Sequence, residues 1–194
     1  MIAVQESKRS IFEIFGMILL NPRETFGYII AKKSGLEEAL IFLIYALSIF
    51  AKYAMLYIAL SQNSFIYSWL RAISLDFTTF TLVFTFVAFI TLFLSAGVAH
   101  FLAKSAKGIG EFREAVTLFT FSSVANAVVI IGAGFSLSLP SPIDLGVVLF
   151  SLIIYLVWKA FLFMLAVEEV YGIGESEAFI AGVVGPLILG VLIW

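Results

Sequence analysis

Five polar side chains stand inside or at the ends of long apolar stretches, and they are the chain's candidates for chemistry: Lys52, His100, Asn126, Lys159 and Glu168. A lysine at the centre of a membrane span costs about 3 kcal/mol, so such residues are rare unless they have a partner or a task. Ammonium, amide and carboxylate groups between helices can hold a partner helix or a small solute. These five residues therefore define a candidate intramembrane polar site.

Lys52 has two interpretations. It lies about 20 Å along the helix beyond Ala39, past the middle of a hydrocarbon core about 30 Å thick. In the first interpretation its long side chain snorkels to the far interface beside Tyr53 and Tyr57. In the second it faces the bundle interior, as part of a site for a partner or a solute.

The other candidates have similar alternatives. Asn126 lies about 17 Å into its span, where an amide usually bonds to a neighbouring helix and less often forms a functional polar site. Lys159 is near the emerging end of its span and is expected to reach cytosolic water. His100 is one turn from Lys104; it can titrate near neutral pH, although an interfacial histidine is the commoner case.

The residue inventory argues against catalysis and metal binding. The chain has no cysteine and one histidine, which excludes thiolate chemistry and a multi-histidine metal site within one chain. Ser122 and Ser123 have no suitably placed base, because His100 is distant in the sequence. We expect no catalytic, metal-binding or cofactor-binding residues, and no enzymatic activity.

The composition is that of a protein dissolved in lipid. Hydrophobic residues make up 62% of the chain and charged residues 12%, which is more apolar surface than a soluble domain of 194 residues buries. The net charge of −2 provides no basic surface for nucleic acid. The expected partners are membrane lipids and either further copies of this chain or other membrane proteins.

The apolar runs predict an all-α polytopic protein with five transmembrane helices, preceded by one or two amphipathic interfacial helices. Residues 1–35 would form the cytoplasmic or interfacial amphipathic region, and residues 36–194 the transmembrane domain. Within the first region, Ser7 to Leu20 has helical apolar spacing, and Asn21 and Pro22 start a second helix that ends at Gly35. These helices would lie among lipid headgroups, pack on the spans from the cytosol, or both. The five expected spans are about 39–60, 77–103, 115–134, 143–167 and 178–194.

A glycine-acid phrase precedes the first, third and fifth spans. One copy begins at Gly35, and the other two share the tetrapeptide Gly-Ile-Gly-Glu. Carboxylates are favoured where a helix begins, because the exposed N–H groups give that end a partial positive charge. The phrases are start signals, and the doubled tetrapeptide predicts that spans two and three repeat as spans four and five. The loop residues of the two tetrapeptides are Gly108, Gly110, Glu111, Gly172, Gly174 and Glu175.

Basic residues predict the orientation. With the N-terminus inside, the inner segments carry eight basic residues and the outer segments carry Arg71 alone, as the positive-inside rule requires. An odd number of spans then places the C-terminus on the opposite side of the cell membrane. The inner basic residues are Lys8, Arg9, Arg23, Lys32, Lys33, Lys104, Lys107 and Arg113.

The order of features resembles the Yip domain family, the five-span Ypt/Rab-interacting integral membrane proteins, and in particular its prokaryotic members. Three segments carry the resemblance: Asn21 to Phe26, His100 to Ala115, and Trp158 followed by Val170 to Ala178. The resemblance covers essentially the whole chain. It implies an oligomeric integral membrane protein with a cytoplasmic N-terminus, and it transfers no catalytic residue.

Two functions remain open. The first is a membrane scaffold or adaptor of undefined activity, which organises or shapes the membrane or recruits partners through the N-terminal helices. The alternative is a small-solute or ion transporter or channel with a polar site between its helices.

Overall fold

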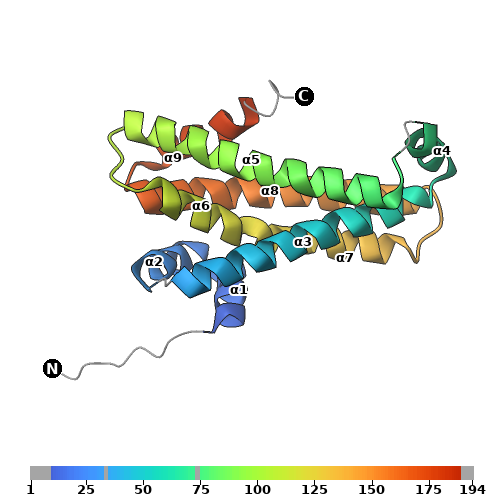
Figure 1. Ribbon diagram of the computed structural model, residues 1–194, viewed down its shortest axis with the longest axis horizontal. Coiled ribbons are helices and arrows are strands. Elements are labelled where there is room, and N and C mark those ends of the chain that lie inside the picture. Colours follow the sequence, from blue (N-terminus) through green and yellow to red (C-terminus); the bar gives the residue numbers. More distant parts are fainter. Residues whose placement is uncertain (1–9, 33–34, 73–74, 189–194) are drawn as a thin grey trace.

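The structure is a computed structural model that describes residues 10–32, 35–72 and 75–188, and these residues form an all-helical bundle (Figure 1). The elements in chain order are α1 (Ile11–Leu20), α2 (Pro22–Lys32), α3 (Gly35–Ser61), α4 (Ser64–Ala72), α5 (Phe77–Ser105), α6 (Phe112–Phe121), the 3₁₀ turn η1 (Ser122–Ala125), α7 (Asn126–Ser136), α8 (Ile143–Tyr171), α9 (Glu175–Phe179) and the π-helical turn η2 (Ile180–Val184).

Four stretches of the described chain are long and apolar enough to cross a membrane: Glu38–Ser61, Phe77–Ser105, Phe112–Ser136 and Ile143–Tyr171. They make the chain an integral membrane protein. The fifth expected span, 178–194, contains the end of α9 and the turn η2, but residues 189–194 lie outside the described residues. The count of five spans therefore stays a prediction.

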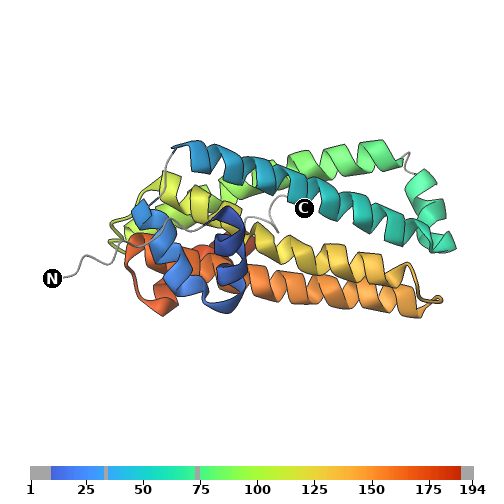
Figure 2. The same ribbon diagram turned by 90° about the horizontal axis from the view of Figure 1, so that it is seen from below.

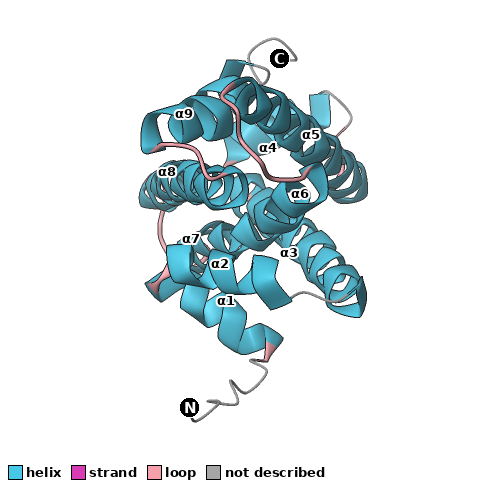
Figure 3. Cartoon of the chain, turned by 90° about the vertical axis from the view of Figure 1, so that its left-hand side faces the viewer, coloured by secondary structure: helices cyan, strands magenta, loops and turns pink. Residues whose placement is uncertain are grey.

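The long helices run along the longest axis of the molecule, with α1 and α2 gathered at one end and α4 at the other (Figures 1 and 2). We call these the α2 end and the α4 end. Viewed from the α2 end, α6 lies between α2 and α5 (Figure 3). In the most apolar stretch of the third span 67% of the residues are buried inside the protein, compared with 22% in that of the first span. The third span is the central helix, and fully buried small residues such as Ala115, Ala125 and Ala133 let its neighbours approach closely.

The third span is interrupted, although the sequence predicts a continuous helix over 115–134. The 3₁₀ turn η1 separates α6 from α7 at the middle of the span. The hydroxyl of Ser122 donates to the carbonyl of Phe119 at 2.5 Å. A serine that bonds back to its own helix competes for the carbonyls of the α-helical ladder, which favours a local tightening.

The N-terminal helices pack on the spans. Ser10 caps α1 through a capping box with Glu13, as expected of a helix start. Ile18 of α1 and Phe26 of α2 are fully buried in the main hydrophobic core, and α2 lies against α8. Packing on the bundle is thus observed, and contact with lipid headgroups stays a prediction.

Candidate functional site

A cavity of about 330 Å³ lies within the membrane-spanning part of the bundle, among α3, α5, η1, α7 and α8. Three of the five predicted site residues line it, and each comes from a different helix: Lys52, Asn126 and Lys159. Glu168 and His100 do not line it. The remaining lining residues are Tyr45, Ile49, Tyr53, Leu56, Phe84, Val87, Ala88, Thr91, Ser122, Ser123, Leu152, Tyr155 and Leu156.

Lys52 faces the cavity, and the interpretation that it snorkels to the far interface is wrong. Its side chain is 5% exposed, and its ammonium donates to the hydroxyl of Tyr155 at 3.3 Å. The direction of the side chain explains this. Cα–Cβ bonds in a helix tilt toward the N-terminus, and α3 begins at the α2 end. Lys52, about 14 Å from the α4 end of its helix, therefore points back toward the middle of the bundle.

Lys159 also points toward the middle, and its side chain is half-buried, so the expectation that it reaches cytosolic water stays a prediction. Its ammonium donates to the hydroxyl of Tyr155, one turn earlier on α8, at 3.0 Å. Because α8 begins at the α4 end, its side chains tilt toward that end, away from the α2 end. Two lysines on antiparallel helices therefore converge on one depth of the bundle.

Tyr155 joins the two lysines, and the sequence analysis missed it. Both ammonium nitrogens lie within hydrogen-bond distance of its one phenol oxygen, so they are no farther apart than the sum of those two distances. Two unit charges about 6 Å apart repel by about 3 kcal/mol at an effective dielectric constant of about 20. The sequence contains one sign of the role of Tyr155: it lies four residues before Lys159, and residues at this spacing lie on the same face of a helix.

Aromatic rings provide the other contacts of the two ammonium groups. Lys52 lies 4.3 Å from the ring centroid of Tyr53, and Lys159 lies 5.3 Å from that of Phe163. Cation–π contacts of this kind stabilise a desolvated ammonium by about 1–2 kcal/mol. Within the described part of the chain, no carboxylate forms an ion pair with either lysine.

Asn126 links the central helix to α3. It begins α7 directly after the 3₁₀ turn, it is 3% exposed, and its amide donates to the hydroxyl of Ser48 at 3.0 Å. An interhelical amide bond in a membrane contributes roughly 0.6–2 kcal/mol. Asn126 therefore has the structural role that its depth suggests, and it also forms part of the cavity wall.

Glu168 lies at the α2 end, where it anchors the N-terminal helices. Both of its carboxylate oxygens accept from Nη2 of Arg23 on α2, at 2.7 and 2.8 Å, and Glu175 accepts from the same nitrogen at 3.4 Å. Hydrogen bonding to Glu168 raises the pKa of the Arg23 guanidinium above its ordinary value. Glu168 is paired with a cation of its own and is not available to Lys52 or Lys159.

His100 belongs to a contact between α5 and the end of α8. Its Nδ1 lies 2.7 Å from the hydroxyl of Tyr171, and its ring meets that of Phe112 edge-on at 5.8 Å between centroids. This histidine is held by a tyrosine and an aromatic ring near the α2 end. It is separate from the cavity.

The first Gly-Ile-Gly-Glu copy lies against the end of α8, directly before the second copy. The N–H of Ile109 donates to the carbonyl of Tyr171 at 3.1 Å, and a Cβ on Gly110 would lie 2.1 Å from the carbonyl oxygen of Val170. Gly110 is therefore required by a close approach of two backbones, in addition to its place before a helix. Gly172 ends α8 with φ +62°, a conformation that favours glycine. Helix α6 begins directly after Glu111, and α9 directly after Gly174.

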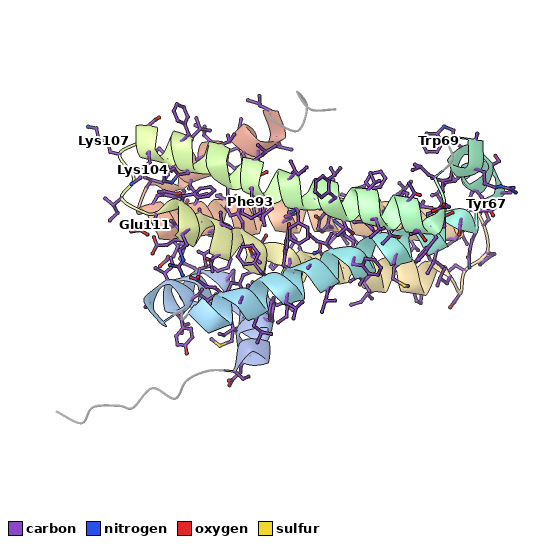
Figure 4. All side chains as sticks on the ribbon, viewed as in Figure 1. Tyr67, Trp69, Phe93, Lys104, Lys107 and Glu111 are labelled. Atoms are coloured by element: carbon purple, nitrogen blue, oxygen red, sulfur yellow. The ribbon has the colours of Figure 1, made fainter. Side chains whose placement is uncertain are left out.

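The side chains separate the two ends chemically (Figure 4). Lys104, Lys107 and Glu111 lie at the α2 end, whereas Tyr67 and Trp69 of α4 lie at the opposite end. An apolar bundle of spans with charged groups at one end and an aromatic helix at the other is the arrangement of a polytopic membrane protein.

Comparison with protein families gives the particular family. The Yip1 domain model matches residues 15–194, and the chain therefore belongs to the Yip1 domain family. The expected resemblance is confirmed. Comparison with curated proteins and with solved structures gives no match.

Proposed function

We propose that the chain is a non-enzymatic membrane scaffold or adaptor whose N-terminal hairpin, α1 and α2, recruits partners or organises lipid. One observation carries the proposal: the hairpin is fixed to the spans, and it nevertheless exposes apolar side chains on its outer surface. Phe26 is fully buried and Arg23 is bonded to Glu168, so the hairpin is held in place. At the end of α1, Leu19 and Leu20 are 50% and 87% exposed. Its partners are lipids, further copies of the chain, or other membrane proteins.

The α2 end is the cytoplasmic end in this proposal, and the C-terminus lies on the opposite side. Lys104 and Lys107 lie at this end, whereas Arg71 follows the exposed Trp69 in α4 at the other. Cytoplasmic segments of membrane proteins are enriched in lysine and arginine, and tryptophan and tyrosine favour the interface. Labelling of single cysteines introduced beside Lys107 and beside Trp69, in intact cells with a membrane-impermeant reagent, tests this orientation. Modification of the first and not the second would contradict it.

The non-enzymatic part of the proposal is supported by the way nucleophiles and bases are engaged. Ser122 donates to a backbone carbonyl of its own helix, and His100 is bonded to Tyr171. Nucleophilic catalysis needs a hydroxyl within reach of a base, which these two contacts do not provide.

The test of the scaffold is a change of surface that leaves the core intact. Deleting residues 1–34 would also remove the buried Ile18 and Phe26, so the double variant L19S/L20S is the sharper probe. In proximity labelling from the native membrane, we expect this variant to lose the partners that the wild-type chain labels. Ile109→Ser is the matched control, because Ile109 is 85% exposed at the same end. An unchanged set of partners in the double variant would refute a recruiting role of the hairpin.

A second candidate is transport of a small solute or ion, and the specific observation in its favour is the cavity shared by Lys52, Asn126 and Lys159. Proteoliposomes containing the purified chain should then show flux that Lys52→Ala or Asn126→Ala alters. Flux equal to that of protein-free liposomes would eliminate transport and leave the scaffold.

A further inference from the structure

We propose that the cavity between α3 and α8 binds an oxyanion, a phosphate or carboxylate group, held between Lys52 and Lys159 with Tyr155 as a third donor. This goes beyond the scaffold role and does not depend on it. It is a statement about binding, and it holds with or without flux across the membrane.

The hydrogen-bonding groups at the centre of the cavity are donors. Each ammonium group has three N–H donors and uses one on Tyr155. The phenol oxygen accepts from both lysines, so its own O–H remains as a donor, and it donates to no group of the described residues. A ligand at this point has to accept several hydrogen bonds at once, as the oxygens of a phosphate or carboxylate do.

The charge of the cavity favours the same ligand. Lys52 is 95% buried and has no carboxylate partner among the residues that the structure describes. The other polar side chains of the wall are neutral amides and hydroxyls, which carry no negative charge to compensate the ammonium groups: Tyr45, Tyr53, Thr91, Ser122, Ser123 and Asn126. Buried charges in proteins are paired or bind an ion, and two cations around a cavity are completed by an anion.

The cavity is of suitable size and reaches the surface of the spans. Its volume of about 330 Å³ is at the lower end of the range of small-molecule pockets, roughly 300–1,000 Å³. Leu156 lines it and is 60% exposed within a membrane-spanning helix, so a wall residue of the cavity is also part of the protein surface. The oxyanion can therefore belong to an anionic lipid that enters from the bilayer or to a small soluble anion.

The experiment measures the thermal unfolding midpoint of the full chain in a non-ionic detergent after removal of bound lipid. The probes are phosphatidylglycerol in mixed micelles, inorganic phosphate and acetate, with phosphatidylcholine and chloride at equal ionic strength as references. We expect at least one oxyanion probe to raise the midpoint in a saturable way, because a ligand that binds the folded state stabilises it. Saturation by phosphatidylglycerol alone identifies a lipid, and saturation by phosphate or acetate identifies a soluble anion. Both results support the proposal.

The variant K52M/K159M removes both charges and keeps the length of the side chains. We expect it to raise the half-saturating concentration of the effective probe at least tenfold. The matched control K104M/K107M removes two lysines exposed at the α2 end and should change that concentration by less than twofold. Tyr155→Phe, which removes the shared oxygen and keeps both lysines, should weaken binding to an intermediate degree, and it serves as the test if the double variant does not fold.

Two results would overturn the proposal. One is an absence of saturable stabilisation of the wild-type chain by all three oxyanion probes. The other is stabilisation that K52M/K159M or Tyr155→Phe retains in full, because the ligand would then bind elsewhere.

Discussion

Replacing Lys52 by methionine should make the folded protein more stable. Lys52 is 5% exposed and lies beside a second ammonium group instead of a carboxylate. Methionine has a similar length and flexibility, fills the same space, and removes one of the two converging charges. A residue that serves ligand binding and destabilises the folded state gives a more stable protein when it is replaced.

The magnitude follows from four contributions. Transfer of the ammonium into the span costs about 3 kcal/mol, and its repulsion with Lys159 costs about 3 kcal/mol at an effective dielectric constant of about 20. Against these, the charged hydrogen bond to Tyr155 contributes about 2 kcal/mol and the cation–π contact with Tyr53 about 1–2 kcal/mol. The net expectation is that Lys52→Met raises the free energy of unfolding by about 2–3 kcal/mol.

The assay is reversible unfolding by SDS in mixed micelles, since the ammonium reaches water in the SDS-unfolded chain. Lys107→Met is the control, because Lys107 is exposed at the α2 end, and its replacement should change the free energy of unfolding by less than about 0.5 kcal/mol. A decrease in stability of 1 kcal/mol or more for Lys52→Met would refute the reasoning and show that the ammonium holds the bundle together.

Three further predictions concern the fold. Gly110→Ala should lower the free energy of unfolding by about 1–3 kcal/mol or more in the SDS titration, because the new Cβ meets the backbone of Val170. Gly146→Ala is the control: nothing lies near its Cβ, so the free energy of unfolding should stay equal or rise by about 0.5–1 kcal/mol. Asp76 caps α5 by accepting the backbone N–H of Thr79 at 2.7 Å, and this hydrogen bond lowers the pKa of the Asp76 carboxyl. The stability that the cap contributes is therefore present above the ordinary carboxyl pKa of about 4, and it is lost as the pH falls through the lower pKa of the folded state. Asp76→Asn should accordingly make the unfolding midpoint depend less on pH in this range. Phe119 is fully buried and stacks at 3.9 Å on a phenylalanine of α8, so Phe119→Ala should cost about 3–5 kcal/mol by circular-dichroism-monitored unfolding, and a loss below 1 kcal/mol would contradict this packing.

The positions of the spanning helices could be predicted well. The expected spans 39–60, 77–103 and 143–167 lie within α3, α5 and α8 (Gly35–Ser61, Phe77–Ser105 and Ile143–Tyr171), each helix extending by up to four residues at its ends. Apolar length and terminal polar residues determine these helices because backbone polar groups must be satisfied within the segment in lipid. The 3₁₀ turn at Ser122 could not be predicted, because serine also occurs in continuous helices. The turn accompanies one side-chain rotamer of Ser122, the one that donates to the carbonyl of Phe119, and the residue type alone does not specify that rotamer.

The candidate site could be predicted only in part. The types and depths of Lys52, Asn126 and Lys159 marked them as unusual in a membrane, and the structure places all three around one cavity. His100 and Glu168 lie outside the cavity, and each contacts a residue of an element that is distant in the sequence. His100 contacts Tyr171, and Glu168 accepts from Arg23. Such partners depend on which helices are neighbours, and a single sequence does not contain that information.

The sequence by itself determined that this chain crosses a membrane as helices, which residues begin them, and that charges stand at costly depths. Only the tertiary structure decided where those charges point. Lys52 and Lys159 converge because α3 and α8 run in opposite directions on two sides of the cavity, and each side chain tilts toward the start of its own helix. Likewise, the two Gly-Ile-Gly-Glu phrases each begin a helix by local chemistry, while the contact of Gly110 with Val170 follows from packing two helix ends together.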